Sequence, residues 1–269
     1  MTAHLIGLTG IPGTGKSHFA RSARALGKTA VALTDPKEAS FYGTDGVSEF
    51  YDLDWRPHAS VYNASALNAL FAWFDARYKD DSEYLVLDTG SEASDLAMNE
   101  VLKMHATGDP SDVSHGKAYT GHDGLIRALV TEMRRCVVRG KTVICTFHAQ
   151  MRELEGAGDA QKRQSFGDKN KMEWQFEDQM LPAMRSSIRQ RIAAPFDLWL
   201  YTKPTGFGPA RKYYVTAVAD TTRPAKHSVT FKPGTNPAMI GNTLSELLSA
   251  IQEPSAAPPQ LAAASSPAK

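Results

Sequence analysis

The residues best suited to chemistry in this sequence form an octet at positions 10–17. The octet reads GIPGTGKS and fits the pattern G-x-x-x-x-G-K-[ST]. Glycines at this spacing let the backbone curl so that successive N–H groups point at phosphate oxygens, while Lys16 reaches the β- and γ-phosphates and the Ser17 hydroxyl ligates Mg²⁺. The sequence therefore predicts a site for a nucleoside triphosphate with Mg²⁺. The expected nucleotide-binding residues are Gly10, Pro12, Gly13, Thr14, Gly15, Lys16, Ser17 and His18.

A second acidic element is expected to complete the magnesium shell. Residues 84–88 read YLVLD, an apolar run that ends in Asp88 and is followed by small residues. A carboxylate at the end of such a strand can bind a water of the hydrated ion. Asp88 is therefore expected to hold Mg²⁺ together with Ser17. The alternative is that Asp88 caps the helix that follows.

Hydrolysis also needs a group that orients or deprotonates water, and two glutamates are candidates. Glu38 follows the second apolar strand by a few residues, and Glu92 follows Asp88 by four. Glu38 is the preferred catalytic residue, with a solvated loop charge as the alternative, because a glutamate in the first turn of a helix, as Glu92 would be, commonly interacts with the helix dipole. His148, directly after the strand-like run TVICTF, is the candidate sensor of the γ-phosphate; a structural histidine is the alternative.

Composition excludes several classes of protein. The formal net charge is +1, so nucleic-acid binding would need a local basic patch rather than a basic protein as a whole. The two cysteines, Cys136 and Cys145, lack C-x-x-C spacing and are expected to be buried free thiols in a reducing cytoplasm. No window approaches 18 apolar residues, and a cytoplasmic location is expected.

Apolar runs alternate with segments of helical periodicity, which predicts an α/β fold with a mainly parallel sheet flanked by helices. Strands are expected at 4–9, 29–34, 84–88 and 142–147, followed by a late antiparallel pair at 197–202 and 212–219. Helices are expected at 16–26, 60–78, 91–105 (with Ser91 as N-cap), 122–139, 179–192 and 244–251. Loops are expected at 34–46, 106–121 and 151–175.

The expected domain organisation has three parts. An ATPase domain spans 1–232, a short helical extension spans 233–252, and an Ala/Pro/Ser-rich tail at 253–269 is expected to be disordered.

Several segments together resemble a known family. GIPGTGKS, a second strand followed by Asp35, YLVLDTGSEASD, VICTFHAQ and a late FDLWLY occur in that order. They are similar to those of phage nucleotide-binding ATPases of the RecA-like class, described as single-strand annealing or recombination proteins. The resemblance covers residues 5–228 and implies a RecA-like P-loop ATPase core. It further implies ATP hydrolysis with Mg²⁺, assembly into rings or filaments, binding of single-stranded DNA, and a possible single-strand-binding protein partner for the tail.

The resemblance implies that the loops at 106–121 and 151–175 face DNA. The second loop has basic and aromatic residues suited to single strands, but its acidic residues balance them, which leaves a solvated loop as the alternative. Where the family has a glutamate two residues after the strand-two aspartate, this chain has Lys37, with Glu38 next.

Basic residues gather late in the chain. Between residues 203 and 232, six basic residues accompany one acid, Asp220. One interpretation is a DNA-facing patch. A second is a source of Arg or Lys fingers that complete the ATP site of a neighbouring subunit. The third is a solvated basic edge that discourages strand pairing. The finger candidates are Arg223, Lys226, Arg185, Arg189 and Arg191.

Three functions are consistent with these features. The preferred one is a DNA-dependent ATPase in phage recombination or replication. The alternatives are a P-loop kinase of a nucleotide or small molecule, with 151–191 as its lid, and a nucleotide-gated assembly factor with weak hydrolysis.

Overall fold

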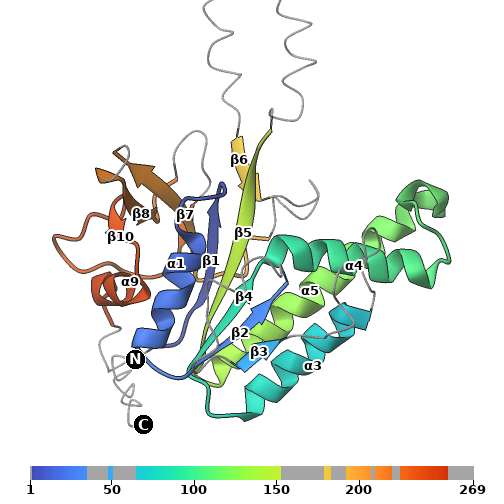
Figure 1. The fold of residues 1–269 in the computed structure, drawn as a ribbon, viewed down its shortest axis with the longest axis horizontal. Helices are drawn as coiled ribbons and strands as arrows, with labels where there is room; N and C mark the ends of the chain where they lie inside the picture. Colours follow the sequence, from blue (N-terminus) through green and yellow to red (C-terminus); the bar gives the residue numbers. More distant parts are fainter. Residues whose placement is uncertain are drawn as a thin grey trace, which may run out of the picture.

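A twisted sheet with helices on both faces forms the body of the protein (Figure 1). The computed structural model describes residues 2–34, 48–50, 65–152, 179–182, 192–206, 210–219 and 225–253. Within them, the strands follow the order β10-β8-β7-β1-β5-β4-β2-β3, with β6 paired to β5 and β9 to β7. Neighbours from β3 to β7 along this path are parallel, whereas β8 and β10 are antiparallel additions at one edge.

The strands are β1 (Leu5–Gly10), β2 (Thr29–Leu33), β3 (Ser48–Phe50), β4 (Tyr84–Asp88), β5 (Thr142–Arg152), β6 (Gln179–Pro182), β7 (Leu198–Thr205), β8 (Lys212–Thr216), β9 (Lys226–His227) and β10 (Ile240–Gly241). The helices are α1 (Lys16–Arg21), α3 (Ser65–Lys79), α4 (Gly90–Met104), α5 (Lys117–Val138) and α9 (Leu244–Ala250), with short 3₁₀ turns η1 (Ser22–Ala25), η4 (Pro110–Asp112) and η5 (Ser114–Gly116).

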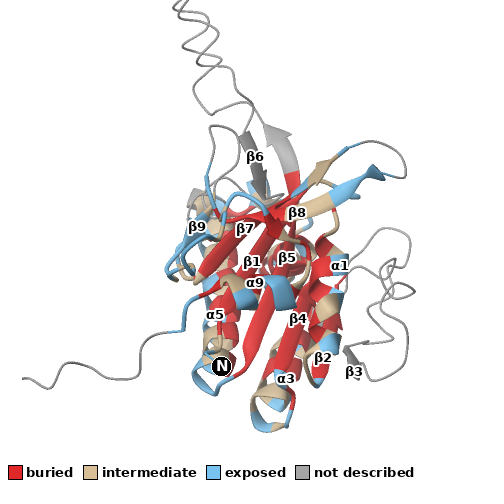
Figure 2. Cartoon of the chain, turned by 90° about the vertical axis from the view of Figure 1, so that its left-hand side faces the viewer, coloured by how far each residue is buried: buried red, intermediate tan, exposed pale blue. Residues whose placement is uncertain are grey.

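Alternation along the strands divides the apolar side chains between two cores, because successive residues of a strand point to opposite faces of the sheet. Leu85 and Leu87 of β4 pack with α3, α4 and α5 on one face. Val86 of the same strand packs with α1, η1 and α9 on the other. The central strands are consequently buried on both faces (Figure 2), as expected of a parallel sheet covered by helices.

The predicted fold class is confirmed. The sheet is mainly parallel, helices flank it, and β7 and β8 form the late antiparallel hairpin. β5 lies between the phosphate-loop strand β1 and the Asp88 strand β4. The predicted buried free thiols are also confirmed, and burial raises the pKa of Cys136 to about 11. In the part of the chain described, no helix has the length and apolarity needed to cross a membrane.

Several predicted boundaries are wrong, and the strand predicted at 142–147 continues to Arg152. Residues 179–182 form strand β6 rather than the start of a helix, because they pair with the extended end of β5. α5 begins at Lys117, whereas the predicted helix began at residue 122. The helix includes Gly121, where an added Cβ would lie 3.1 Å from Val101 Cγ2 of α4. The helix after β4 is capped by Thr89, whose side chain accepts a hydrogen bond from the Glu92 N–H at 3.2 Å, so neither Ser91 nor Asp88 is the N-cap.

The segment predicted as a helical extension is joined to the sheet. β10 pairs with β8, and Leu244 and Leu247 of α9 are fully buried in the core beside α1. The division of the chain at residue 232 stays a prediction.

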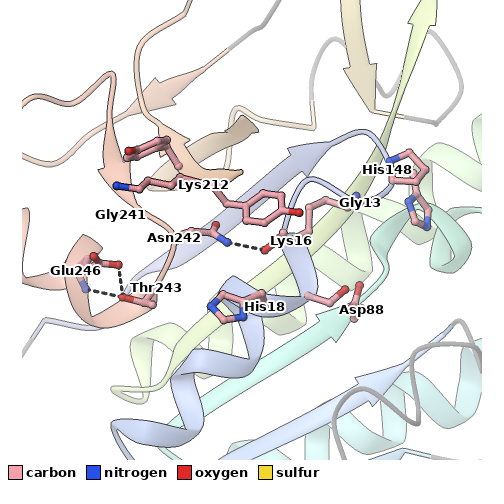
Figure 3. A pocket seen from close by; sticks show the side chains of 15 residues that line it. Gly13, Lys16, His18, Asp88, His148, Lys212, Gly241, Asn242, Thr243 and Glu246 are labelled. Carbon is pink, nitrogen blue, oxygen red and sulfur yellow. Dashed lines mark hydrogen bonds between the residues drawn. The ribbon is translucent and has the colours of Figure 1, made fainter. Parts of the chain in front are cut away.

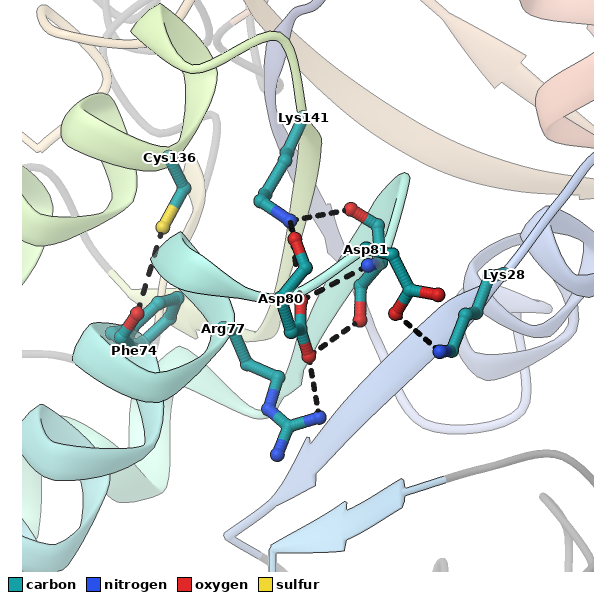
Figure 4. Close-up of polar contacts among 8 residues, drawn as sticks. Lys28, Phe74, Arg77, Asp80, Asp81, Cys136 and Lys141 are labelled. Atoms are coloured by element: carbon teal, nitrogen blue, oxygen red, sulfur yellow. Dashed lines mark hydrogen bonds and ion pairs between the residues drawn. The ribbon is translucent and has the colours of Figure 1, made fainter.

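A buried ammonium group fastens the ends of α3, β4 and β5 opposite the phosphate loop (Figure 4). Lys141 Nζ donates to the carbonyl oxygens of Asp80 and Ser82, at 2.7 Å each, and to Asp80 Oδ1 at 3.2 Å. Partial burial of Asp80 opposes ionisation, but the Ser82 N–H and the Lys141 ammonium outweigh it, so the pKa of Asp80 lies below its usual 3.8. Arg77 contributes a further ion pair to Asp80 at 2.7 Å.

Replacement of Lys141 by methionine is expected to destabilise the fold by about 2–3 kcal/mol at pH 7, since hydrogen bonds to charged groups are lost and buried carbonyls remain. Because the pKa of Asp80 is lowered by folding, its ionised form stabilises the protein above pH 3.8 and this contribution is lost as the pH falls through the folded-state pKa. The parent protein and Lys141→Met should therefore differ less in their free energy of unfolding in acid than at pH 7, as measured by urea denaturation. Lys103→Met, at an exposed position of α4, is the control and should unfold like the parent protein.

Candidate functional site

The phosphate loop follows β1 and curls back into α1. Gly13 and Gly15 have φ values of 74° and 92°, a left-handed conformation that glycine adopts without strain. At Gly15 a side chain would also meet the Asn242 amide nitrogen at 2.5 Å. Lys16 is 6% exposed, and its Nζ donates to the carbonyls of Gly10 at 2.8 Å and Ile11 at 3.1 Å. The ammonium group is thus held over the curled backbone.

Two buried threonines anchor this loop to the neighbouring strand β7. Thr14 Oγ1 donates to the Ile11 carbonyl at 2.7 Å and lies 2.6 Å from Thr202 Oγ1. Thr202 Oγ1 also lies 3.3 Å from the Thr9 carbonyl, to which it donates. The Thr202 hydroxyl fills the space beside Gly10, where an added Cβ would lie 2.0 Å from Thr202 Oγ1. The loop conformation is therefore fixed by β7 as well as by its own glycines.

The loop opens into a cavity of about 800 Å³, which is large enough for a nucleotide. Most of the predicted site residues line it: Pro12, Gly13, Gly15, Lys16, Ser17, His18, Asp88 and His148. Gly10 and the buried Thr14 support the loop from below. Figure 3 shows Asp88 and His148 on one side of Lys16 and the late residues Lys212, Asn242, Thr243 and Glu246 on the other.

Asp88 ends β4 beside the loop and is 1% exposed. Thr146 of β5, itself fully buried, donates its hydroxyl proton to Asp88 Oδ1. Burial, together with the Asp88 charge, raises the pKa of the neighbouring Cys145 thiol well above its usual value and keeps it protonated. The carboxylate is thus oriented by a neighbouring strand at the edge of the cavity.

His148 lines the cavity but lies within β5, which continues to Arg152, rather than directly after a strand that ends at residue 147. Its backbone N–H donates to Ser91 Oγ at 3.0 Å, which ties β5 to α4 and gives Ser91 a role other than capping. Its ring Nδ1 is buried with no hydrogen-bond partner among the described residues. Glu92 lies in the first turn of α4, as the dipole interpretation expects.

Several predicted residues cannot be placed. Glu38, with Asp35 and Lys37, lies outside the described residues, as do Arg185, Arg189, Arg191, Arg223 and residues 153–175 of the predicted DNA-facing loop. Lys226 is described on β9, where its Nζ donates to the carbonyls of Ala194 and Phe196. These hydrogen bonds fasten β9 to the segment that leads into β7.

Sequence reasoning missed the late residues of the cavity. Tyr213 comes from β8, Asn242 follows β10, and Thr243 and Glu246 begin α9. The T-x-x-E spacing of Thr243 and Glu246 is a capping box and announces the start of the helix. Nothing in that spacing indicates that β10 pairs with β8 and brings the segment to the phosphate loop. Thr146 and Thr202 were missed for the same reason, since their roles depend on strand neighbours.

No curated protein matches the chain. Similar solved structures include flagellar accessory protein FlaH from Methanocaldococcus jannaschii, with 13% identity, coverage of 80% of this chain and 78% of that chain, and a TM-score of 0.43. Another is the KaiC-like protein PH0186 from Pyrococcus horikoshii OT3, with 12% identity, coverage of 79% and 78%, and a TM-score of 0.40. A family model described as AAA domain matches residues 3–229, which include the phosphate loop, Asp88 and His148. The chain therefore belongs to the AAA domain family and is a nucleotide-binding protein of the P-loop ATPase type.

Proposed function

We propose that this protein hydrolyses ATP with Mg²⁺ and couples the reaction to single-stranded DNA, as a homo-oligomer in phage recombination or replication. The observation that carries the ATPase proposal is one cavity that joins Lys16 and Ser17 of the phosphate loop to the buried carboxylate of Asp88. Lys16 supplies the positive charge that the transferring phosphoryl group needs, and positioning with electrostatic stabilisation accounts for most of phosphoryl-transfer catalysis.

The residues present fit a magnesium ion shared with phosphates. Ser17 offers a hydroxyl and Asp88 a carboxylate on the same cavity, both oxygen ligands of the kind that Mg²⁺ prefers. Among the described residues, no group of three or more His, Cys, Asp or Glu side chains forms a metal cage. This agrees with an ion held by one or two protein oxygens, substrate phosphates and water. When bound, the ion would neutralise charge on the phosphates.

His148 is proposed as the group that senses the γ-phosphate. Its buried Nδ1 lacks a partner among the described residues, and its ring lines the Asp88 side of the cavity. Since β5 continues past His148 to Arg152, a shift of this ring would act on the strand that leads into the segment after it.

The DNA part of the proposal rests on the sequence resemblance and on one face of the β7–β8 hairpin. The strand register places Lys203 opposite Tyr214 and Thr205 opposite Lys212, so these four side chains belong to one face. Lys203 and Lys212 are exposed and Tyr214 is half-buried; Lys212 and Tyr214 also line the nucleotide cavity, so this face adjoins the ATP site. Cationic groups that follow a phosphate backbone, with an aromatic ring for base stacking, suit single strands.

The test measures ATP turnover with and without single-stranded DNA, together with sizing in a non-hydrolysable ATP analogue. Stimulation by DNA and nucleotide-dependent oligomers support the proposal. Lys203→Glu should weaken DNA binding and reduce its salt dependence, whereas Lys103→Glu on α4 is the matched control. Phosphate transfer to a nucleoside monophosphate would contradict the proposal, as would an ATP turnover rate that single-stranded DNA does not change.

A further inference from the structure

The cavity beside the phosphate loop has two chemically different ends. β5 and β4 lie on one side of β1 and carry His148 and Asp88, whereas β7, β8 and β10 lie on the other. The end formed by Tyr213, Asn242, Thr243 and Glu246 is called the distal end here. A nucleotide that places its phosphates on the loop and its terminal phosphate toward Asp88 must extend its nucleoside toward the distal end (Figure 3).

Side chains of the distal end are in direct contact with the phosphate loop. Asn242 is 8% exposed, and its Nδ2 donates to the Gly15 carbonyl at 3.1 Å. The Tyr213 ring lies against the same glycine, 3.2 Å from the position of an added Cβ. A second link joins the segment to the loop helix, because the Leu244 N–H donates to Ser22 Oγ at 2.7 Å. The distal end is therefore held at a fixed distance from the phosphate site.

Lys212 lines this side of the cavity as a cation, whereas the other polar and aromatic groups of the distal end are suited to a sugar and a base. Glu246 Oε2 accepts from Thr243 Oγ1 at 2.6 Å, and the carboxylate is folded against Gly241. Glu246 is exposed, and among the described residues the hydrogen bond to its carboxylate is made to Oε2, which leaves Oε1 toward solvent. A carboxylate repels phosphate but accepts hydrogen bonds from hydroxyl groups, and acidic side chains recognise ribose hydroxyls in other nucleotide sites. Tyr213 adds an aromatic surface for a base.

We propose that the distal end binds the nucleoside of the nucleotide, with Glu246 accepting a hydrogen bond from a ribose hydroxyl and the Tyr213 ring contacting the base. The inference rests on the proposed ATP binding and deepens it. Asn242, Thr243 and Glu246 lie beyond residues 3–229, the part that matches the family.

The test uses the full chain and three ligands, ATP, 2′-deoxy-ATP and inorganic tripolyphosphate, in isothermal titration calorimetry. The parent protein should prefer ATP to 2′-deoxy-ATP by about tenfold, the value of one hydrogen bond to a charged group. Glu246→Ala should weaken ATP binding by about tenfold, leave 2′-deoxy-ATP binding within about twofold and leave tripolyphosphate unchanged. Ser249→Ala, at another exposed position of α9, is the matched control and should behave as the parent.

A second variant tests the base contact. Tyr213→Leu keeps an apolar side chain against Gly15 but removes the ring, so ATP and 2′-deoxy-ATP should both bind at least about fivefold more weakly, with tripolyphosphate unaffected. The inference is overturned if Glu246→Ala and Tyr213→Leu both bind ATP as tightly as the parent protein. It is also overturned if the variants lose as much affinity for tripolyphosphate as for ATP. Absence of ATP binding in the parent protein would instead overturn the proposed function itself, and the two failures are thereby distinguished.

Discussion

Replacement of Lys16 by alanine is expected to lower ATP affinity by about 100-fold and turnover by about 10²–10³-fold, because the main cation of the phosphate site is removed. Lys16 is the buried lysine whose ammonium group is held by the Gly10 and Ile11 carbonyls. In the complex with ATP, the Lys16 ammonium group would interact with phosphate oxygens. Water that entered its place in the variant would not supply the lost positive charge. Titration calorimetry and phosphate release measure the two effects.

Two further variants separate loss of charge from loss of fold. Lys16→Arg keeps the positive charge but replaces a compact ammonium by a planar fork, so it should retain some binding and still hydrolyse poorly. Lys103→Ala removes an exposed lysine of α4 and should change neither property. Unimpaired ATP binding by a folded Lys16→Ala protein would refute the site at residues 10–17.

Asp88→Asn is expected to separate binding from hydrolysis. The change keeps the shape of the side chain and its oxygen acceptor for Thr146, but it removes the negative charge next to the cavity. Turnover in Mg²⁺ should fall by about 10²–10³-fold. ATP affinity measured without Mg²⁺ should stay unchanged or rise, since a carboxylate no longer faces the phosphates. Turnover of Asp88→Asn close to that of the parent would exclude Asp88 from the magnesium shell.

Thr146→Val offers a milder form of the same test. Valine matches the shape of threonine but removes the Thr146 hydroxyl that donates to Asp88 Oδ1, so Asp88 is less firmly positioned. We expect turnover to fall by about tenfold, with a higher Mg²⁺ concentration needed for half-maximal rate. A purely structural role would lower stability without moving the Mg²⁺ dependence.

The phosphate side of this site could be predicted from the sequence because its signals are local. Residues 10–17 carry their loop geometry in their own glycines, and YLVLD announces both a buried strand and the acid that ends it. The sheet then brings Asp88 and the loop together, since carboxyl ends of parallel strands meet at one edge. His148 was found by the same argument.

The other side could not be predicted, because it depends on pairings between distant segments. The sequence predicts a helix that begins at residue 179, whereas residues 179–182 form a strand because β5 extends far enough to pair with them. Thr202 lies within a strand that was expected, yet its role comes from contact with Thr14, which is 188 residues away in sequence. Asn242 is placed by a two-residue strand, which is too short to give a periodic signal.

The pairing of β10 with β8 also determines where the chain can be shortened. A protein ended at residue 229, the last residue matched by the family, would lose β10 and α9 together. Val215 and Phe19 would lose the cover of Ile240, Leu244 and Leu247, and β8 would become an open strand edge with an apolar face. Such an edge is a template for pairing with other chains, so we expect a shortened protein to need the residues up to Ile251, whose side chain packs in the same core.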